Sequence, residues 1–150
     1  MIKSISLGAM VLLSSFSVNA TENLITYESP YSVQQTADRF ASIAQSKGLN
    51  VFARIDHQKN AEGVGLSLRP TQVILFGNPK VGTPLMNCAQ NMAIDLPQKA
   101  LISEDAEQRV WLSFNHPEYL KVRHNIKGCD ALINKVTNVL NMLGKTTVEH

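Results

Sequence analysis

Apolar residues recur with helical spacing in a segment that follows the first thirty residues. The stripe runs through Val33, Ala37, Phe40, Ala41 and Ala44 and predicts a helix over residues 33–47. Ser32 and Gln35 have the spacing of a capping box at its start, and Gly48 can supply a left-handed conformation at its end. These signals are local, so both ends of the helix are predicted.

A second helical stripe lies near the C-terminus. It consists of Leu132, Ile133, Val136, Val139, Leu140 and Leu143 and predicts a helix with one buried face. Gly144 follows the last apolar position, and we expect it to end the helix.

The segments between these helices have the features of β-strands. Residues 23–28 predict a first strand, and Leu49, Val51, Ala53 and Ile55 alternate as if they pointed to one face of a second. The apolar run 73–76 follows Pro70 without alternation, which predicts a central strand covered on both faces.

Two more strands are predicted within residues 96–105 and 108–115, with an acidic turn at 104–108. Residues 57–65 are polar and glycine-rich, which indicates a loop or a single helical turn. A short helix is expected at 116–126, with Pro117 in its first position. The order of strand, helix, four strands and helix predicts an α+β fold, with helices packed on one face of a mainly antiparallel sheet.

The stretch "LFGNPKVGTPLM" (75–86) is a candidate for a phosphate-binding loop. Gly77 and Gly82 have the glycine spacing of a mononucleotide P-loop, but Thr83 stands where that motif requires lysine. We therefore reject the P-loop and expect a turn in which Thr83 caps a short helix over residues 84–92. An anion held at that helix N-terminus beside Lys80 is the functional alternative.

The N-terminal segment has the pattern of a secretory signal. Lys3 precedes an apolar core over residues 5–18, and Val18 and Ala20 have the small-residue pattern of a cleavage site. We expect cleavage after Ala20, which leaves residues 21–150 as a single domain in the periplasm or outside the cell. An uncleaved N-terminal anchor is the alternative.

Charge gives no sign of a polyanionic partner. The chain has 14 Lys and Arg residues against 12 Asp and Glu residues, and the basic residues are scattered along it. We therefore expect no nucleic-acid partner, and we expect no contact with a membrane once the signal is removed.

Cys88 and Cys129 are the two cysteines of the chain. In an oxidising compartment they predict one disulfide, which would close a loop of roughly forty residues and stabilise the fold by about 4 kcal/mol. A redox-active or metal-binding pair is the alternative, although such pairs are usually closer in sequence.

No complete catalytic or metal-binding motif is present, so we expect neither a cofactor nor a tightly bound metal. His116 and His124 are separated by two helical turns, roughly 12 Å, which is too far for one metal ion. The polar residues near predicted strand and helix ends remain as candidates for ligand binding: His57, Arg69, Asn78, Lys80, Thr83, Arg123 and His124.

Three blocks of the sequence carry a family resemblance. "LRPTQVILFGNPKVGTPLM", "IDLPQKALI" and "HPEYLKVRH" resemble the domain of unknown function 302 family, from about residue 31 to residue 126. The resemblance implies an α+β fold of the same element order, and it implies no catalytic residue. His116 departs from the family pattern, in which Asp is expected before the proline.

These observations leave three classes of function. The first is a non-catalytic module that binds a small ligand or a protein partner, with a homodimer included. The second is a small hydrolase or isomerase that uses His57 or His124 as general base and an arginine as anion anchor. The third is a metal-handling protein that uses His57, His116 and His124.

Overall fold

The computed structural model describes residues 23–150, so the predicted signal of residues 1–20 lies outside the described residues. A five-stranded sheet forms the centre, and every neighbouring pair of strands is antiparallel. In spatial order the strands are β1 (Leu24–Ser29), β5 (Val110–Asn115), β4 (Gln98–Glu104), β3 (Thr71–Gly77) and β2 (Asn50–Asp56). The predicted α+β fold is confirmed.

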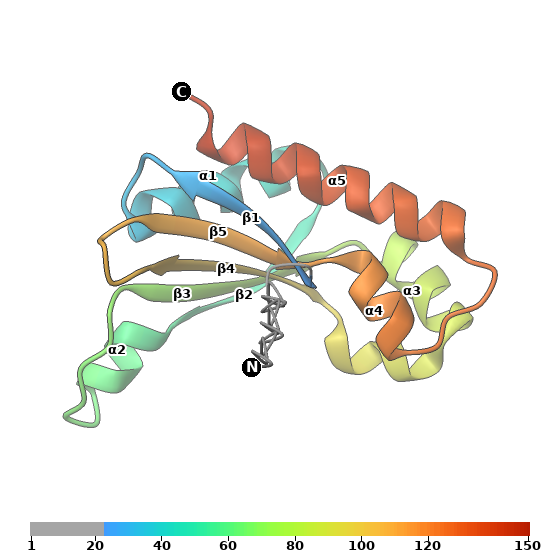
Figure 1. Ribbon diagram of the computed structural model, residues 1–150, viewed down its shortest axis with the longest axis horizontal. Helices are drawn as coiled ribbons and strands as arrows, with labels where there is room; N and C mark the ends of the chain where they lie inside the picture. Colours follow the sequence, from blue (N-terminus) through green and yellow to red (C-terminus); the bar gives the residue numbers. More distant parts are fainter. Residues whose placement is uncertain (1–22) are drawn as a thin grey trace, which may run out of the picture.

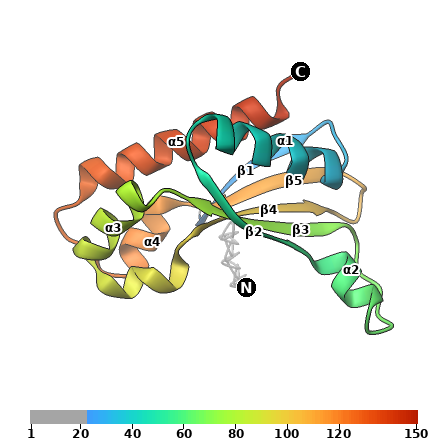
Figure 2. The same cartoon turned by 180° about the vertical axis from the view of Figure 1, so that it is seen from behind.

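Two long helices, α1 (Val33–Ser46) and α5 (Asp130–Val148), cover one face of this sheet (Figure 1). The view from behind shows the same arrangement, with the short α2 (His57–Glu62) at one end of the sheet (Figure 2). The other short helices gather at the opposite end: α3 (Pro79–Cys88), η2 (Gln90–Asp95) and α4 (Pro117–Arg123).

The core lies between the sheet and the two long helices. Phe40 of α1 packs edge-on against Phe76 of β3, with ring centroids 4.9 Å apart, and lies 5.7 Å from the ring of Phe114. The predicted capping box of α1 is confirmed. The Ser32 side chain accepts the backbone N–H of Gln35, and the Gln35 side chain accepts the backbone N–H of Ser32. Gly48 has the expected left-handed conformation, with φ of 76°.

The expectation that β3 is covered on both faces is wrong. Gln72, Ile74 and Phe76 are buried toward the helices, whereas Val73 and Leu75 alternate with them and stay half-buried on the other face. In the described part of the chain, α1 and α5 lie on one side of the sheet only (Figures 1 and 2). The unbroken apolar run therefore does not distinguish one covered face from two.

The predicted alternation of the second strand is also wrong, because β2 contains a bulge. Val51 pairs with Phe76 and Ala53 pairs with Leu75, so Phe52 between them is an extra residue in the ladder. Paired residues point to the same face, which puts Val51 toward the core and Ala53 on the opposite face. A bulge of this kind re-aims the side chain it carries.

The short helix after β3 begins earlier than predicted. Asn78, not Thr83, is its N-cap: Asn78 Oδ1 accepts the Lys80 backbone N–H at 2.9 Å. Pro79 occupies the first turn, where its missing N–H costs nothing, and Pro84 lies inside the helix. The sequence has two pairs of a capping residue followed by proline, Asn78–Pro79 and Thr83–Pro84, and the helix begins at the first pair.

Gly144 does not end the last helix, since α5 continues to Val148. A Cβ built at Gly144 would stand 2.2 Å from Cε2 of Tyr27 in β1. The glycine therefore permits close approach of α5 to the sheet edge rather than a left-handed turn.

Candidate functional site

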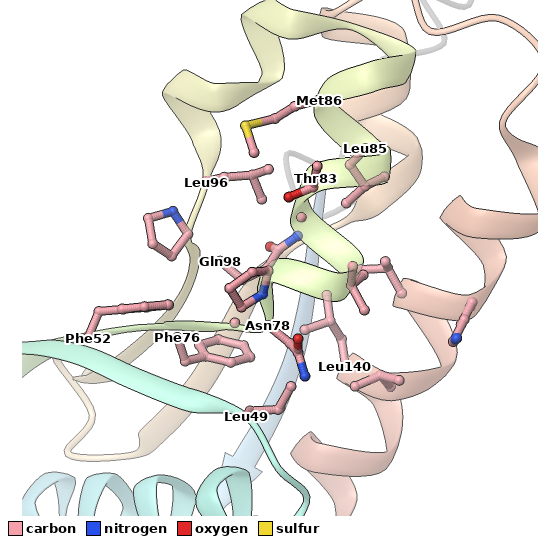
Figure 3. A pocket seen from close by; sticks show the side chains of 18 of the residues that line it. Leu49, Phe52, Phe76, Asn78, Thr83, Leu85, Met86, Leu96, Gln98 and Leu140 are labelled. Carbon is pink, nitrogen blue, oxygen red and sulfur yellow. The ribbon is translucent and has the colours of Figure 1, made fainter.

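A half-open pocket of about 570 Å³ lies at the end of the sheet that carries α3. Its walls come from the ends of β2 and β3, from α3, from the start of β4 and from α5 (Figure 3). The lining is almost entirely apolar and includes Leu49, Phe76, Leu85, Leu96 and Leu140. It has the size and the character of a small-molecule site.

The β2 bulge supplies one wall of this pocket. Phe52 is among the lining side chains, although 53% of its surface is exposed. The ring lies beside Gly77 at the end of β3, where an added Cβ would be in ordinary van der Waals contact with Phe52 Cε2, at 3.9 Å. An exposed aromatic ring at the edge of an apolar pocket can contact a ligand without further rearrangement.

Three of the polar residues that line the pocket are Asn78, Lys47 and Lys135. The amide of Asn78 is committed to the protein: its Nδ2 donates to the Gly48 carbonyl at 3.2 Å, and its Oδ1 caps α3. Lys47 and Lys135 are exposed residues, so they place positive charge near the opening.

Gln98 is the polar residue buried deepest in this lining, with 8% of its surface exposed. It pairs with Phe76 across the β3–β4 ladder and so points to the helix-covered face of the sheet. Its Nε2 is the one fully buried side-chain nitrogen or oxygen atom in residues 23–150 that has no hydrogen-bond partner. Figure 3 shows the Gln98 amide among the lining side chains, toward the middle of the pocket.

A second polar cluster lies beside the pocket and not in it. His124 Nε2 is 2.5 Å from Asp95 Oδ2, and Arg123 Nε is 3.3 Å from the same oxygen. Lys99 Nζ donates to the carbonyls of Asp95 and Pro97, at 3.0 and 3.2 Å. The cluster ties α4 to the segment between η2 and β4.

The cysteine pair connects the same region to α5. Cys88 ends α3 and Cys129 precedes α5, with sulfur atoms 1.98 Å apart and Cα atoms 6.5 Å apart. The Cα separation lies within the limit of about 7 Å for a disulfide. The structure therefore has a cysteine pair at disulfide distance, and the covalent bridge stays a prediction for the purified protein.

The structure brings together only part of the predicted binding set. Asn78 and Thr83 line the pocket, while Lys80 lies in the first turn of α3 with its N–H bonded to Asn78. His57 begins α2 at the other end of the sheet (Figure 1). The remaining three are used elsewhere: Arg69 Nε donates to the Glu104 carbonyl at 3.1 Å, and Arg123 and His124 bind Asp95.

Thr83 lies inside α3, so the helix N-terminus expected there is at Asn78 instead. His116 instead caps α4, since its Nδ1 accepts the Glu118 N–H at 3.1 Å. Within residues 23–150, no group of three or more His, Cys, Asp or Glu side chains could hold a metal ion. Gln98 and Phe52 were not predicted as site residues. The burial of Gln98 and the bulge at Phe52 both depend on segments that are distant in sequence.

The family described as Domain of unknown function DUF302 matches residues 25–143. The chain belongs to this family. A crystal structure of an uncharacterized conserved DUF302 protein from Bacillus stearothermophilus is similar in fold, with a TM-score of 0.77 and 14% identity. The similarity covers 84% of this chain and 98% of that one.

Two relatives have names that refer to an ion channel. "Fluoride-specific ion channel FluC 1" of Brucella suis biovar 1 (strain 1330) is 47% identical over 103 residues, which are 69% of this chain and 41% of that protein. "Fluoride-specific ion channel FluC 2" of Brucella melitensis biotype 1 shares the same identity over 38% of its length. The DUF302 chain thus spans about two-fifths of these curated relatives. Within residues 23–150 of this chain, none of the helices has the length and apolar character that a membrane span requires.

Proposed function

We propose that this DUF302 domain is a non-catalytic module that binds a small, largely apolar ligand in the pocket between α3, β4 and α5. One observation carries the proposal: a pocket of about 570 Å³ with an apolar lining is built into the end of the sheet. Ligand sites are commonly concave, apolar and of roughly 300–1,000 Å³. Burial of apolar ligand surface there would supply the main binding free energy.

The walls of the pocket are tied together, which supports a preformed site. The cysteine pair joins the end of α3 to the start of α5. Asp95 and His124 join η2 to α4. A ligand that enters such a site orders few side chains, so little of its binding energy is lost to conformational entropy.

The test is the binding of the fluorescent dye N-phenyl-1-naphthylamine to purified residues 21–150. We expect enhanced emission with the wild type and loss of that emission in Val139→Trp, because Val139 lines the pocket on α5. Val122→Trp is the matched control, since Val122 is 77% exposed on α4 and outside the lining. Absence of dye binding, or equal binding in Val139→Trp, would contradict the proposal.

The catalytic alternative has less support. His57, His116 and His124 are all outside the pocket lining. His124, one of the two expected bases, and Arg123, one of the candidate anion anchors, both bind the same carboxylate oxygen of Asp95. A substrate in the pocket would therefore meet neither an expected histidine base nor an arginine, because neither residue type is in the lining.

A second candidate function is to support the activity of a membrane channel protein. The specific observation is that the Brucella relatives contain a region 47% identical to this chain within longer proteins named as fluoride channels. The test is fluoride release from vesicles that contain the Brucella suis relative without its matched 103 residues. Restoration of release by this chain added in trans would support the candidate, and an unchanged rate after the deletion would contradict it.

We also propose that the domain acts outside the cytoplasm. The signal pattern of residues 1–20 supports export, and a cysteine pair at disulfide distance suits an oxidising compartment. The intact mass of the exported protein tests the proposal, with Thr21 as the expected first residue. A cytoplasmic protein that retains residues 1–20 would contradict it.

A further inference from the structure

We infer that the ligand of this pocket carries a hydrogen-bond acceptor, such as a carbonyl oxygen, on its apolar body, and that Gln98 Nε2 donates to it. The inference rests on the proposed function, because it specifies the ligand of the same site. Its starting observation is the buried Nε2 without a partner, in a residue that lines the pocket.

Three acceptors near Gln98 already take hydrogen bonds from other groups of the protein. The carbonyls of Asp95 and Pro97, just before it in sequence, accept from Lys99. Asn78 Oδ1, across the pocket, accepts the N–H of Lys80. Each of these oxygens already accepts a hydrogen bond from another group, and Gln98 Nε2 is bonded to none of them.

Other buried polar side chains on the same side of the sheet have partners. Ser29 Oγ and Thr36 Oγ1 are 2.7 Å apart, and Thr147 Oγ1 donates to the Leu143 carbonyl at 2.7 Å. A buried donor without a partner costs free energy, because the donor loses its bond to water and gains none in the protein. The cost at Gln98 is removed if a ligand supplies the acceptor.

A water molecule is a poor substitute for such a ligand. A buried water is held by two to four polar partners, and the lining around Gln98 is formed mainly by Phe76, Leu85, Leu96 and Leu140 (Figure 3). An apolar molecule with one acceptor oxygen matches both features of the site. Its hydrocarbon surface meets the lining, and its oxygen meets the amide.

The experiment compares two fluorescent probes that differ in one group. Prodan is a naphthalene that carries a dimethylamino and a propionyl group, and 2-(dimethylamino)naphthalene lacks the propionyl carbonyl. Both are titrated into the wild type and into Gln98→Met, which keeps the side-chain length and removes the donor. We expect Gln98→Met to weaken prodan binding about fivefold or more and to shift its bound emission to shorter wavelength. Binding of the carbonyl-free probe should stay within about twofold, because it makes no hydrogen bond.

Each outcome decides the matter. If both probes bind and Gln98→Met affects them equally, the inferred acceptor is wrong while the apolar pocket stands. If neither probe binds the wild type, the proposed function fails and the inference fails with it. If Gln98→Met does not fold, the carbonyl stretching band of prodan in the wild-type complex replaces the comparison. A hydrogen-bonded carbonyl absorbs at lower wavenumber, and an unshifted band overturns the inference.

Discussion

Gln72 and Gln98 point from neighbouring strands to the same buried face of the sheet, but only Gln72 has a hydrogen-bonded amide. Gln72 Nε2 donates to Gln34 Oε1 at 3.1 Å, and its Oε1 accepts from Arg54 Nε at 2.7 Å. Gln98 Nε2 has no partner. The two glutamines are similarly buried, at 5% and 8% exposed, but the fold supplies hydrogen-bond partners only to the amide of Gln72.

The first prediction follows from this difference. Without ligand, Gln98→Met should raise the free energy of unfolding by about 1 kcal/mol, because it removes an unsatisfied buried donor. Gln72→Met should lower it by about 1–3 kcal/mol, because Arg54 and Gln34 lose their partner. Urea unfolding of the two variants measures both changes. Equal destabilisation by the two substitutions would show that Gln98 is satisfied in solution.

The second prediction concerns the contact between Tyr27 and Gly144. Gly144→Ala should lower the free energy of unfolding by about 1–3 kcal/mol or more, because the added methyl overlaps the Tyr27 ring. Gly82→Ala is the matched control within a helix, since its Cβ would meet only Leu96 Cδ1 at 3.9 Å. That variant should be neutral or up to about 1 kcal/mol more stable. A neutral Gly144→Ala would show that α5 can move away from β1 at little cost.

Gly144 and Ser32 also show how far the sequence alone predicts this fold. The capping box of Ser32 and Gln35 lies within four residues, so its geometry follows from local sequence. The role of Gly144 depends on Tyr27, which is 117 positions away. A glycine after an apolar stripe has the same local pattern whether it ends a helix or admits a distant ring.

The candidate site shows the same limit. Asn78 and Thr83 were predicted, because they belong to the glycine- and proline-rich stretch that forms one pocket wall. Gln98 was not, since its burial depends on α3 and α5 closing over the start of β4. Phe52 required a bulge, which the alternation of apolar residues does not indicate. Local sequence therefore named two residues of the lining among its candidates but not the buried donor.

The third prediction concerns stability in acid. The indole N–H of Trp111 donates to Asp105 Oδ2 at 2.8 Å and, with bonds from the Arg109 and Glu107 backbones, holds the pKa of Asp105 below its ordinary value. A carboxyl group whose folded pKa is lowered contributes stability above its unfolded pKa of about 3.9, and this contribution is lost as the pH falls through the folded pKa.

Asp105→Asn should therefore flatten the acid side of the stability profile below about pH 4. Urea unfolding at a series of pH values, followed by circular dichroism, measures the slope. Trp111→Phe removes the largest cause of the shift and should move the acid transition to higher pH. Unchanged slopes in both variants would contradict the assignment.

The fourth prediction concerns the Asp95 cluster. His124→Ala should lower the free energy of unfolding by about 1–3 kcal/mol, because it deprives a largely buried carboxylate of its closest partner. Arg123→Ala should cost at most about 1 kcal/mol, since the Arg123 side chain is half exposed. Thermal or urea unfolding distinguishes the two. Equal effects would mean that the Asp95–His124 contact adds nothing beyond the surface pair.

The last prediction concerns Cys88 and Cys129. Thiol labelling of the exported protein under denaturing conditions should find no free thiol, because the Cα atoms of the two cysteines lie 6.5 Å apart, within reach of a bridge. Cys88→Ala with Cys129→Ala should lower the free energy of unfolding by about 2–4 kcal/mol, mainly through the larger entropy of the unfolded chain.

The same double variant should bind N-phenyl-1-naphthylamine more weakly, because it releases the end of α3, a pocket wall, from the start of α5. Cys88→Ala alone also removes the bridge but keeps Cys129. Its free energy of unfolding should equal that of the double variant if the bridge, and not the Cys129 side chain, accounts for the loss. Two free thiols in the exported protein, or a double variant as stable as the wild type, would contradict the prediction.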